Sequence, residues 1–276
     1  MLFAFRLIMR NFARYFQIKI MMNFYKYQGT GNDFVMIDNR NGEWNNLSIE
    51  SIQKLCDRRF GIGADGLIKI NLAEGVDFEV DYYNSDGSKS FCGNGARCSV
   101  AFAHFLEIFK DKKTIFTAID GIHEAEINGD IVKLKMSDVS GIAEDGSDFV
   151  LNTGSPHYIQ YVVGIENTDV FEKGKAIRNS ENYVKEGINV NFVEQITDDE
   201  IFVRTYERGV EDETYSCGTG VTAAALTYLA KNPAEKIAVK TLGGNLKVYA
   251  EKNAESFTNI WLEGPAQQVF KGETNI

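Results

Sequence analysis

The stretch Cys-Gly-Asn-Gly-Ala at residues 92–96 has a near twin in Cys-Gly-Thr-Gly-Val at residues 217–221, and each opens an apolar segment of helical length. A cysteine directly before a helix lies at the positive end of the helix dipole, beside backbone N–H groups that have no intrahelical partner. This setting is expected to lower the pKa of the thiol and make its thiolate reactive. One such cysteine indicates a nucleophile, whereas two indicate an acid and a base on opposite sides of a substrate.

Both twin stretches lead into segments that are predicted to be buried helices. Residues 96–109 are apolar on nearly every side, and residues 221–230 are rich in alanine. A helix that is apolar all round is buried rather than lying on a surface. A third helix is predicted over Ser48–Arg58, where Ser48 is the expected N-cap of an amphipathic segment.

Short strand-like runs surround the predicted helices. They span residues 33–38, 66–70, 78–83, 114–119, 131–136, 158–163, 201–206, 236–240, 246–250 and 258–262. Several alternate apolar and polar residues, which indicates half-buried antiparallel sheet. Asn128-Gly129-Asp130 is a hairpin signal between two such runs.

Each half of the chain therefore contains strands, then Cys-Gly-x-Gly, then a buried helix, then more strands. This order predicts an α+β fold of two pseudo-symmetric halves, each a mostly antiparallel sheet or barrel wrapped around a central buried helix. The predicted halves are residues 23–143 and 144–276, with the boundary in the stretch Ser140–Asp148. The two cysteines are expected to meet at the interface between the halves, where ligand sites are often found.

Residues 1–22 differ in composition from the rest of the chain. Residues 2–20 contain no acidic residue, and Arg6, Arg10 and Arg14 share one helical face. A secretory signal would need a longer uncharged apolar stretch, and a transit peptide more serine. We interpret residues 1–22 as an N-terminal extension or a misread start, with a targeting or membrane-surface helix as the alternative.

Composition narrows the classes of function. The net charge of −10 argues against a nucleic-acid partner, which would require a basic face. After residues 1–22 no stretch is long and apolar enough to span a bilayer. The chain has 4 cysteines, too few for a disulfide framework at 276 residues, and none form Cys-x-x-Cys. A reducing compartment, the cytoplasm, is therefore expected.

The glycine after each twin cysteine favours a binding function for both helix starts, because a β-carbon there would keep a substrate group away from the backbone. The free N–H groups of Gly93, Asn94, Gly218 and Thr219 are predicted to hold one carboxylate between the two helix ends. Buried structural cysteines are the alternative interpretation, which the duplication of the motif disfavours. Cys56 and Cys98 lack this setting and are predicted to be structural.

Polar clusters flank the two cysteines. Glu207 and Arg208 end a predicted strand shortly before Cys217, and in a cleft they could hold an ammonium and a carboxylate. Gly29-Thr30-Gly31 lacks the residues of a nucleotide-binding loop. The chain has 3 histidines, no two at metal-ligand spacing, so no catalytic metal is predicted.

Several motifs together resemble the diaminopimelate epimerase family. They are Arg-Phe-Gly-Ile-Gly-Ala-Asp-Gly (59–66), Asn-Ser-Asp-Gly-Ser (84–88), Cys-Gly-Asn-Gly-Ala-Arg-Cys (92–98), Gly-Ser-Pro-His (154–157), Gly-Ile-Asn-Val-Asn-Phe (187–192), Glu-Arg-Gly (207–209) and Ser-Cys-Gly-Thr-Gly (216–220). The resemblance runs in order from about residue 24 to the end of the chain.

The resemblance implies a cofactor-free epimerase that interconverts LL- and meso-2,6-diaminopimelate, for lysine and peptidoglycan synthesis. Cys92 and Cys217 would be its thiolate base and thiol acid. Asn32, Asn84, Asn189 and Arg208 would bind the substrate, the last three at the distal carboxylate. Glu207 and the supporting residue His157 would lie near the reacting amino group. Gly93, Asn94, Gly218 and Thr219 would hold the reacting carboxylate. A small-molecule substrate and a homodimer are implied as partners, with neither a nucleic acid nor a membrane.

This sequence departs from the family pattern at two positions relevant to the distal end of the substrate. Ser155 stands where many members have asparagine, and Gly66 where some have a glutamine that contacts substrate. These departures leave open how the distal end of the substrate is bound. Two alternatives for the function also stay open. One is a racemase for another amino acid, such as proline, hydroxyproline or histidine, and the other is a non-catalytic amino-acid-binding protein.

Overall fold

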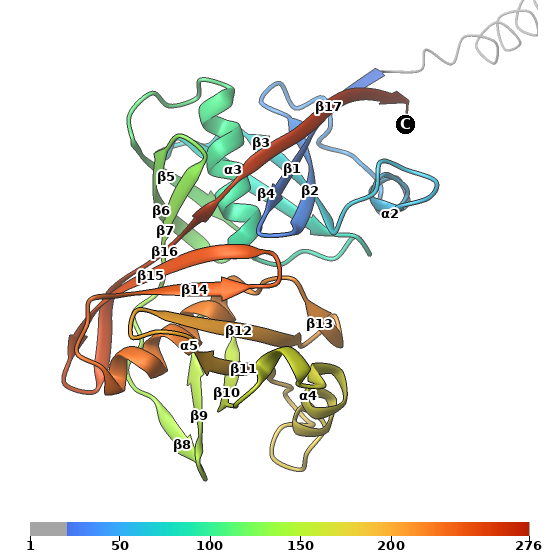
Figure 1. The fold of residues 1–276 in the computed structure, drawn as a ribbon. Coiled ribbons are helices and arrows are strands. Elements are labelled where there is room, and N and C mark those ends of the chain that lie inside the picture. Colours follow the sequence, from blue (N-terminus) through green and yellow to red (C-terminus); the bar gives the residue numbers. More distant parts are fainter. Residues whose placement is uncertain (1–20, 276) are drawn as a thin grey trace, which may run out of the picture.

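The computed structural model describes residues 21–275, which form two halves of similar construction (Figure 1). The predicted extension at residues 1–22 lies outside the described residues, except for Met21 and Met22, which begin the first strand. The strands of the first half are β1 (Met21–Gly29), β2 (Asn32–Asp38), β3 (Gly66–Asn71), β4 (Phe78–Asn84), β5 (Lys113–Ala118), β6 (Gly121–Asn128) and β7 (Ile131–Lys135). Those that follow are β8 (Ala143–Asp145), β9 (Asp148–Asn152), β10 (Pro156–Tyr161), β11 (Asn189–Gln195), β12 (Glu200–Glu207), β13 (Asp212–Thr214), β14 (Lys236–Thr241), β15 (Gly244–Asn253), β16 (Ser256–Pro265) and β17 (Gln267–Asn275).

Strand pairing repeats between the two halves. From β1–β2 to β6–β7 the pairs are antiparallel, parallel, antiparallel, parallel, antiparallel and antiparallel. The pairs from β9–β10 to β15–β16 follow the same order, with β12 and β14 as neighbours. The predicted duplication and the predicted α+β fold class are therefore confirmed.

The central helices are α3 (Gly93–Phe105) and α5 (Gly218–Lys231), each enclosed by the strands of its half (Figure 1). Apolar residues of both helices belong to one hydrophobic core that extends through both halves. The predicted helix over residues 96–109 was wrong at both ends. Its first turn includes Gly93 because Cys92 caps the helix, and it ends at Phe105 because Glu107 has a left-handed backbone with φ of 57°.

Two smaller helices lie outside the central layer. Helix α2 (Ile49–Cys56) begins after Ser48, whose side chain accepts a hydrogen bond from the Ser51 N–H at 3.2 Å, which confirms the predicted N-cap. Helix α4 (Val170–Arg178) was not predicted. Only Val170 and Gly174 of its residues are buried, and one of these is a glycine, so its sequence carries a weak apolar signal.

The chain passes between the halves twice, and both passages end in equivalent pairings. After β7 it continues to β8, which pairs with β9, and after β16 it continues to β17, which pairs with β1. Strands β7 and β16 pair antiparallel with each other and join the two sheets. The division of the chain between residues 143 and 144 stays a prediction. The joining of the two sheets brings the N-termini of α3 and α5 together.

Candidate active site

The first residues of α3 and α5 meet at the junction of the two halves. A β-carbon placed on Gly218 would lie 3.8 Å from the Gly93 Cα and 3.7 Å from the Asn94 Oδ1. The Asn94 Nδ2 donates to the Ser216 carbonyl oxygen at 2.9 Å, across 122 residues of sequence. Cys92 and Cys217 are therefore the N-caps of two helices whose first residues lie close together across the junction.

Cys92 has polar partners from its own half. Its thiol Sγ lies 3.4 Å from the Asn32 Oδ1, to which it can donate, and it accepts from the Gly95 N–H at 3.4 Å. On the other side, the Cys217 Sγ lies 3.5 Å from the Thr219 Oγ1. Each sulfur atom thus has a hydrogen-bonding neighbour, so the protonation state of each thiol changes the hydrogen bonds that it can make.

The expectation of lowered thiol pKa values was wrong for the enclosed site. Burial raises the pKa of Cys92 to about 11, although the N–H groups of Gly95 and Asn94 act in the opposite direction. Burial also raises the pKa of Cys217 to about 12, with the nearby Glu207 carboxylate as the second cause. Desolvation of the thiolate outweighs the helix dipole, so burial favours the neutral thiol at both positions.

Glu207 is within electrostatic reach of both cysteines, because its negative charge raises the pKa of each thiol. Burial raises the pKa of the Glu207 carboxyl itself above its usual value, while a hydrogen bond from the Thr214 Oγ1 at 3.0 Å lowers it. Among residues 21–275 no basic side chain pairs with Glu207, and a partly buried carboxylate of this kind is suited to receive a cation.

His157 is fully buried behind Thr219. The Asn191 Nδ2, which donates to the Tyr158 carbonyl at 3.1 Å, also faces the His157 Nδ1 at 3.1 Å. The His157 Nδ1 is therefore the acceptor, and Nε2–H donates to the Thr219 Oγ1 at 2.9 Å. This places the imidazole where it orients the hydroxyl beside Cys217.

Burial, assisted by the charge of Arg208, lowers the pKa of His157 from 6.5 to about 3. The unfolded chain thus binds one more proton than the folded chain between these values, so stability is lost as pH falls through this window. We expect the free energy of unfolding to fall by up to about 1.4 kcal/mol per pH unit from this group. Urea unfolding at pH 7 and pH 5 should show a smaller loss in His157→Gln than in the unsubstituted protein, and equal losses would contradict the assignment.

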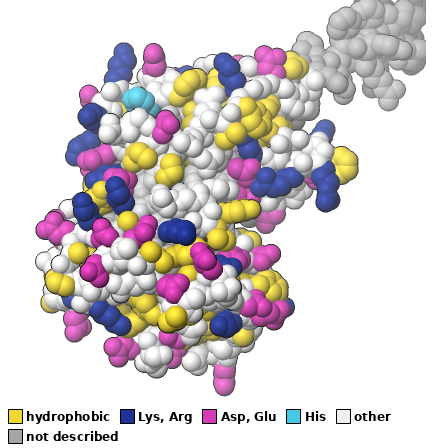
Figure 2. Space-filling model, viewed as in Figure 1, with side chains coloured by type: hydrophobic (Ala, Val, Ile, Leu, Met, Phe, Trp, Pro, Cys, Tyr) yellow, Lys and Arg dark blue, Asp and Glu magenta, His cyan; other side chains and the backbone are white. Residues whose placement is uncertain are grey.

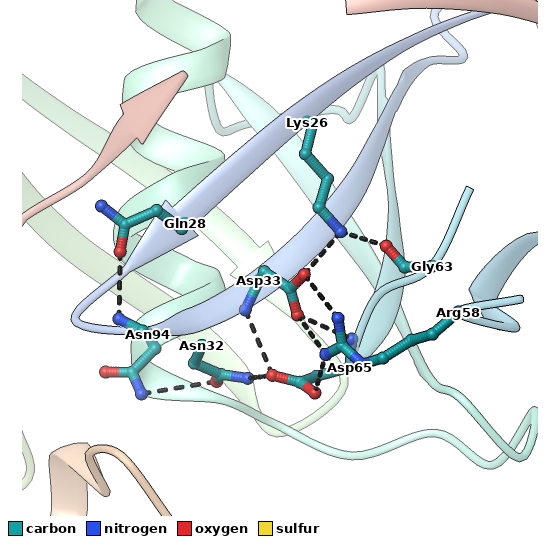
Figure 3. A network of polar contacts seen from close by, with 9 residues as sticks. Lys26, Gln28, Asn32, Asp33, Arg58, Gly63, Asp65 and Asn94 are labelled. Carbon is teal, nitrogen blue, oxygen red and sulfur yellow. Dashed lines mark hydrogen bonds and ion pairs between the residues drawn. The ribbon is translucent and has the colours of Figure 1, made fainter. Parts of the chain in front are cut away.

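Asn32 is held by a network of charged side chains (Figure 3). Its Nδ2 donates to the Asp65 Oδ2 at 2.6 Å, which turns its Oδ1 toward Cys92 and toward the Asn94 Nδ2 at 3.4 Å. Arg58 donates to both Asp33 and Asp65 at 2.7 Å. Burial alone would raise the pKa of Asp33, but hydrogen bonds from Arg58 and Lys26 lower it to about 2. The amide of Asn32 therefore has one fixed orientation.

A second polar group combines Asn189, Arg208 and Ser155. The Asn189 Nδ2 donates to the Ser155 Oγ at 2.8 Å, and the Asn189 Oδ1 accepts from the Arg208 N–H at 2.9 Å. The Arg208 guanidinium donates to the Glu186 carbonyl at 2.9 Å and reaches the Ser155 Oγ at 3.5 Å. Among the described residues no carboxylate pairs with this guanidinium. Ser155 thus takes part in the same cluster as the arginine.

Asn84 lies in a separate cluster. It donates to Ser88 at 3.0 Å and to Ser90 at 3.1 Å, and it accepts from the Tyr82 hydroxyl at 2.9 Å. Within residues 21–275 it has no hydrogen bond to Asn189 or Arg208. The Tyr82 ring fills the space above Gly66, where a β-carbon would lie 2.4 Å from the ring. Sequence reasoning did not single out Tyr82, because an isolated tyrosine at a strand end carries no motif.

Charge and metal-ligand groups show no alternative site in the described part of the chain. Acidic and basic side chains are mixed over the face shown in Figure 2. Residues 21–275 contain no group of three or more histidine, cysteine or acidic residues arranged to hold a metal ion. No described helix is long and apolar enough to cross a membrane.

Two repeated halves, each with a central helix, are the fold of a class that includes racemases and epimerases. A hydroxyproline epimerase from Agrobacterium vitis aligns with a TM-score of 0.64 at 14% identity over 93% of each chain. A phenazine biosynthesis protein of the PhzF family from Bacillus anthracis aligns with a TM-score of 0.69 at 16% identity, over 93% of this chain and all of that one. At these identities the likeness concerns the fold.

Sequence comparison identifies the family within this class. The family model described as diaminopimelate epimerase matches residues 24–141 and 149–269. A diaminopimelate epimerase from Flavobacterium psychrophilum is 51% identical over 259 residues, covering 92% of this chain and all of that protein. One from Aquifex aeolicus is 38% identical, over 91% and 97% of the two chains. The chain belongs to the diaminopimelate epimerase family and is an isomerase.

Proposed function

We propose that this chain interconverts LL- and meso-2,6-diaminopimelate, with Cys92 and Cys217 as the two groups that exchange protons with the α-carbon. The observation that carries this proposal is the meeting of two helix N-termini, each capped by a cysteine, across the junction of the halves. Family membership indicates the substrate, and the two cysteine N-caps indicate proton transfer as the chemistry. Lysine biosynthesis and peptidoglycan precursor supply are the corresponding cellular roles.

In the proposed reaction one cysteine acts as a thiolate and the other as a thiol. The thiolate takes the α-proton, so an S–H bond forms as the C–H bond breaks, and the electron pair passes to the α-carbon and its carboxylate. The opposite thiol then gives its proton to the other face of the α-carbon and becomes the thiolate. The N–H groups of Gly93, Asn94, Gly218 and Thr219 stabilise the charge that grows on the carboxylate.

The substrate ammonium supports formation of the thiolate. Glu207 raises the pKa of both thiols, so an ammonium bound beside it would compensate that charge. The same cation would favour a thiolate directly, through its own charge in an enclosed site. Binding of a zwitterionic substrate thus favours the thiolate, which burial and the charge of Glu207 disfavour.

The cluster of Arg208, Asn189 and Ser155 is proposed to bind the distal carboxylate. An arginine with no carboxylate partner among the described residues and a fixed backbone contact to Asn189 is suited to a planar anion. This favours diaminopimelate over proline, hydroxyproline or histidine, which have no second carboxylate. From family resemblance, Asn84 stays a predicted contact of the distal carboxylate. Retention of both cysteines argues against a non-catalytic binding protein.

Proton NMR of LL-diaminopimelate with the reduced protein in D2O tests this function. We expect the α-proton signal to disappear as deuterium enters, together with appearance of the meso form. Proline and histidine serve as controls and should keep their α-protons. Absence of exchange with LL-diaminopimelate, with all thiols reduced, would contradict the proposal.

The compartment, cofactor requirement and partners of the enzyme stay predictions. A reducing cytoplasm is proposed because two acid–base thiols and two further buried cysteines must stay reduced, and all 4 are free. Catalysis without a cofactor or metal and the absence of a nucleic-acid or membrane partner are further predictions. The homodimer is a prediction from family resemblance.

A further inference from the structure

Arg97 is the largest completely buried side chain in residues 21–275. It lies in the second turn of α3, behind the helix N-terminus that Cys92 caps. Its guanidinium donates only through NH2, to the Asn94 Oδ1 at 2.9 Å and to the Thr30 Oγ1 at 3.2 Å. Its Nε and NH1 have no hydrogen-bond partner among the described residues, and no described carboxylate lies within ion-pair distance.

A buried guanidinium without an anion is costly, because it keeps its charge and loses its water. Other basic groups of this chain avoid that cost: Arg204 pairs with Glu213 at 2.6 Å, and Arg58 with Asp33 at 2.7 Å. The N-terminus of α3 adds partial positive charge beside Arg97 rather than compensating it. This location therefore carries positive charge that an anion in the adjacent site can balance.

The hydrogen bond from Arg97 also decides which way the Asn94 amide points. Because the Asn94 Oδ1 accepts from Arg97, its Nδ2 must face the Ser216 carbonyl of the other half. Ser216 directly precedes Cys217. Through Asn94, the guanidinium in one half thus fixes the chain beside the cysteine of the other half.

We propose that Arg97 is a positioning residue for proton transfer, which orients Asn94 across the junction and supplies the positive charge that favours the thiolate of Cys92 and the charge developing on the substrate carboxylate. This inference rests on the proposed function and deepens it. In support, the charge of Arg97 lowers the pKa of Cys92, against the larger effect of burial and that of Glu207.

Three variants test this role: Arg97→Met, Arg97→Lys and the matched control Arg204→Met. Kinetics give kcat and KM with LL-diaminopimelate. Mass spectrometry of the Cys92 peptide gives the rate of alkylation by iodoacetamide against pH, and thermal unfolding gives stability. A merely structural role would alter stability but leave the alkylation midpoint of the folded protein unchanged.

We expect Arg97→Met to lower kcat by about 10- to 100-fold, the value of a charge-assisted hydrogen bond, with a smaller change in KM. Its alkylation midpoint should move to higher pH, since a nearby cation is lost. Arg97→Lys keeps the charge and should keep the midpoint, but its ammonium on a flexible stem does not hold the donor position of the planar NH2 group, so most of kcat should be lost. Arg204→Met should alter stability alone.

A folded Arg97→Met protein with unchanged kcat and an unchanged midpoint would overturn the proposal. If Arg97→Met does not fold, Arg97→Lys decides, because full kcat in that variant would exclude the positioning of Asn94. If the unsubstituted protein does not epimerise diaminopimelate, the proposed function fails. The alkylation midpoints then still decide whether Arg97 supplies charge to Cys92.

Discussion

Cys92→Ala and Cys217→Ala are each expected to lower kcat for epimerisation by at least about a thousandfold, within the range attributed to general acid–base catalysis. Epimerisation requires a proton to leave one face of the α-carbon and another to arrive on the opposite face. The two cysteines come from opposite halves, so each can serve only one face. Loss of either one interrupts the reaction in both directions.

Proton exchange should respond differently from epimerisation. The cysteine that remains can still remove a proton from its own face and return a deuteron there. In D2O, each single variant should therefore exchange the reacting α-proton of only one stereoisomer, LL or meso, and the two variants should differ in which one. Proton NMR of both stereoisomers measures exchange and epimerisation in the same sample.

Cys56→Ala is the matched control, because Cys56 is also a buried free thiol but lies at the end of α2, outside the site. It should lower stability through the small cavity it creates and leave the stereochemical pattern intact. The two-base assignment is falsified if either active-site variant exchanges both stereoisomers at similar rates.

Gly243→Ala is expected to lower stability strongly. Gly243 lies between β14 and β15 and packs against the turn between β1 and β2 in the other half. A β-carbon there would lie 1.8 Å from the Thr30 carbonyl oxygen, and backbone atoms cannot move aside as a flexible side chain can. The Gly243 N–H also donates to the Tyr215 carbonyl at 2.9 Å, which fixes it in place.

We expect Gly243→Ala to cost about 3 kcal/mol or more, at the upper end of overpacking effects. In a domain of this size that corresponds to a fall in Tm of about 6 to 12 °C. Thr30 adjoins both Arg97 and the turn that carries Asn32, so displacement of the halves should also lower kcat. Calorimetry and the epimerisation assay measure the two effects.

Gly141→Ala is the control for Gly243→Ala. A β-carbon on Gly141 would have no atom within 4 Å, and its backbone is not left-handed. It should leave Tm and kcat unchanged. Equal Tm values for Gly243→Ala and Gly141→Ala would contradict the prediction, because they would show that the backbone at the junction can move to accept a β-carbon.

The central helices and the cysteine pair could be predicted because their sequences carry their own signal. Helices α3 and α5 are apolar on all sides, and the same Cys-Gly-x-Gly motif precedes both of them. Strands with alternating residues, such as β7, were predicted for a similar reason. The repetition itself revealed the two halves.

The missed features depend on contacts that no local pattern records. Nearly every residue of β17 is exposed, so no apolar pattern in its sequence predicts that it pairs with β1. The raised pKa values of Cys92 and Cys217 arise from burial by the opposing half, whereas the sequence shows only the local helix start. The unpaired charge of Arg97 likewise becomes visible only when its neighbours are known.

The pairing of β17 with β1 has a consequence for how the chain is made. The first half receives an edge strand from residues 267–275, the last that the structure describes, so its sheet is incomplete while the ribosome is still adding the second half. Until then β1 exposes an unpaired edge, the kind of surface that aggregates during synthesis. A nascent chain that stalls in the second half would thus lack a complete first sheet, and native structure in the first half should arise only after residues 267–275 have been made.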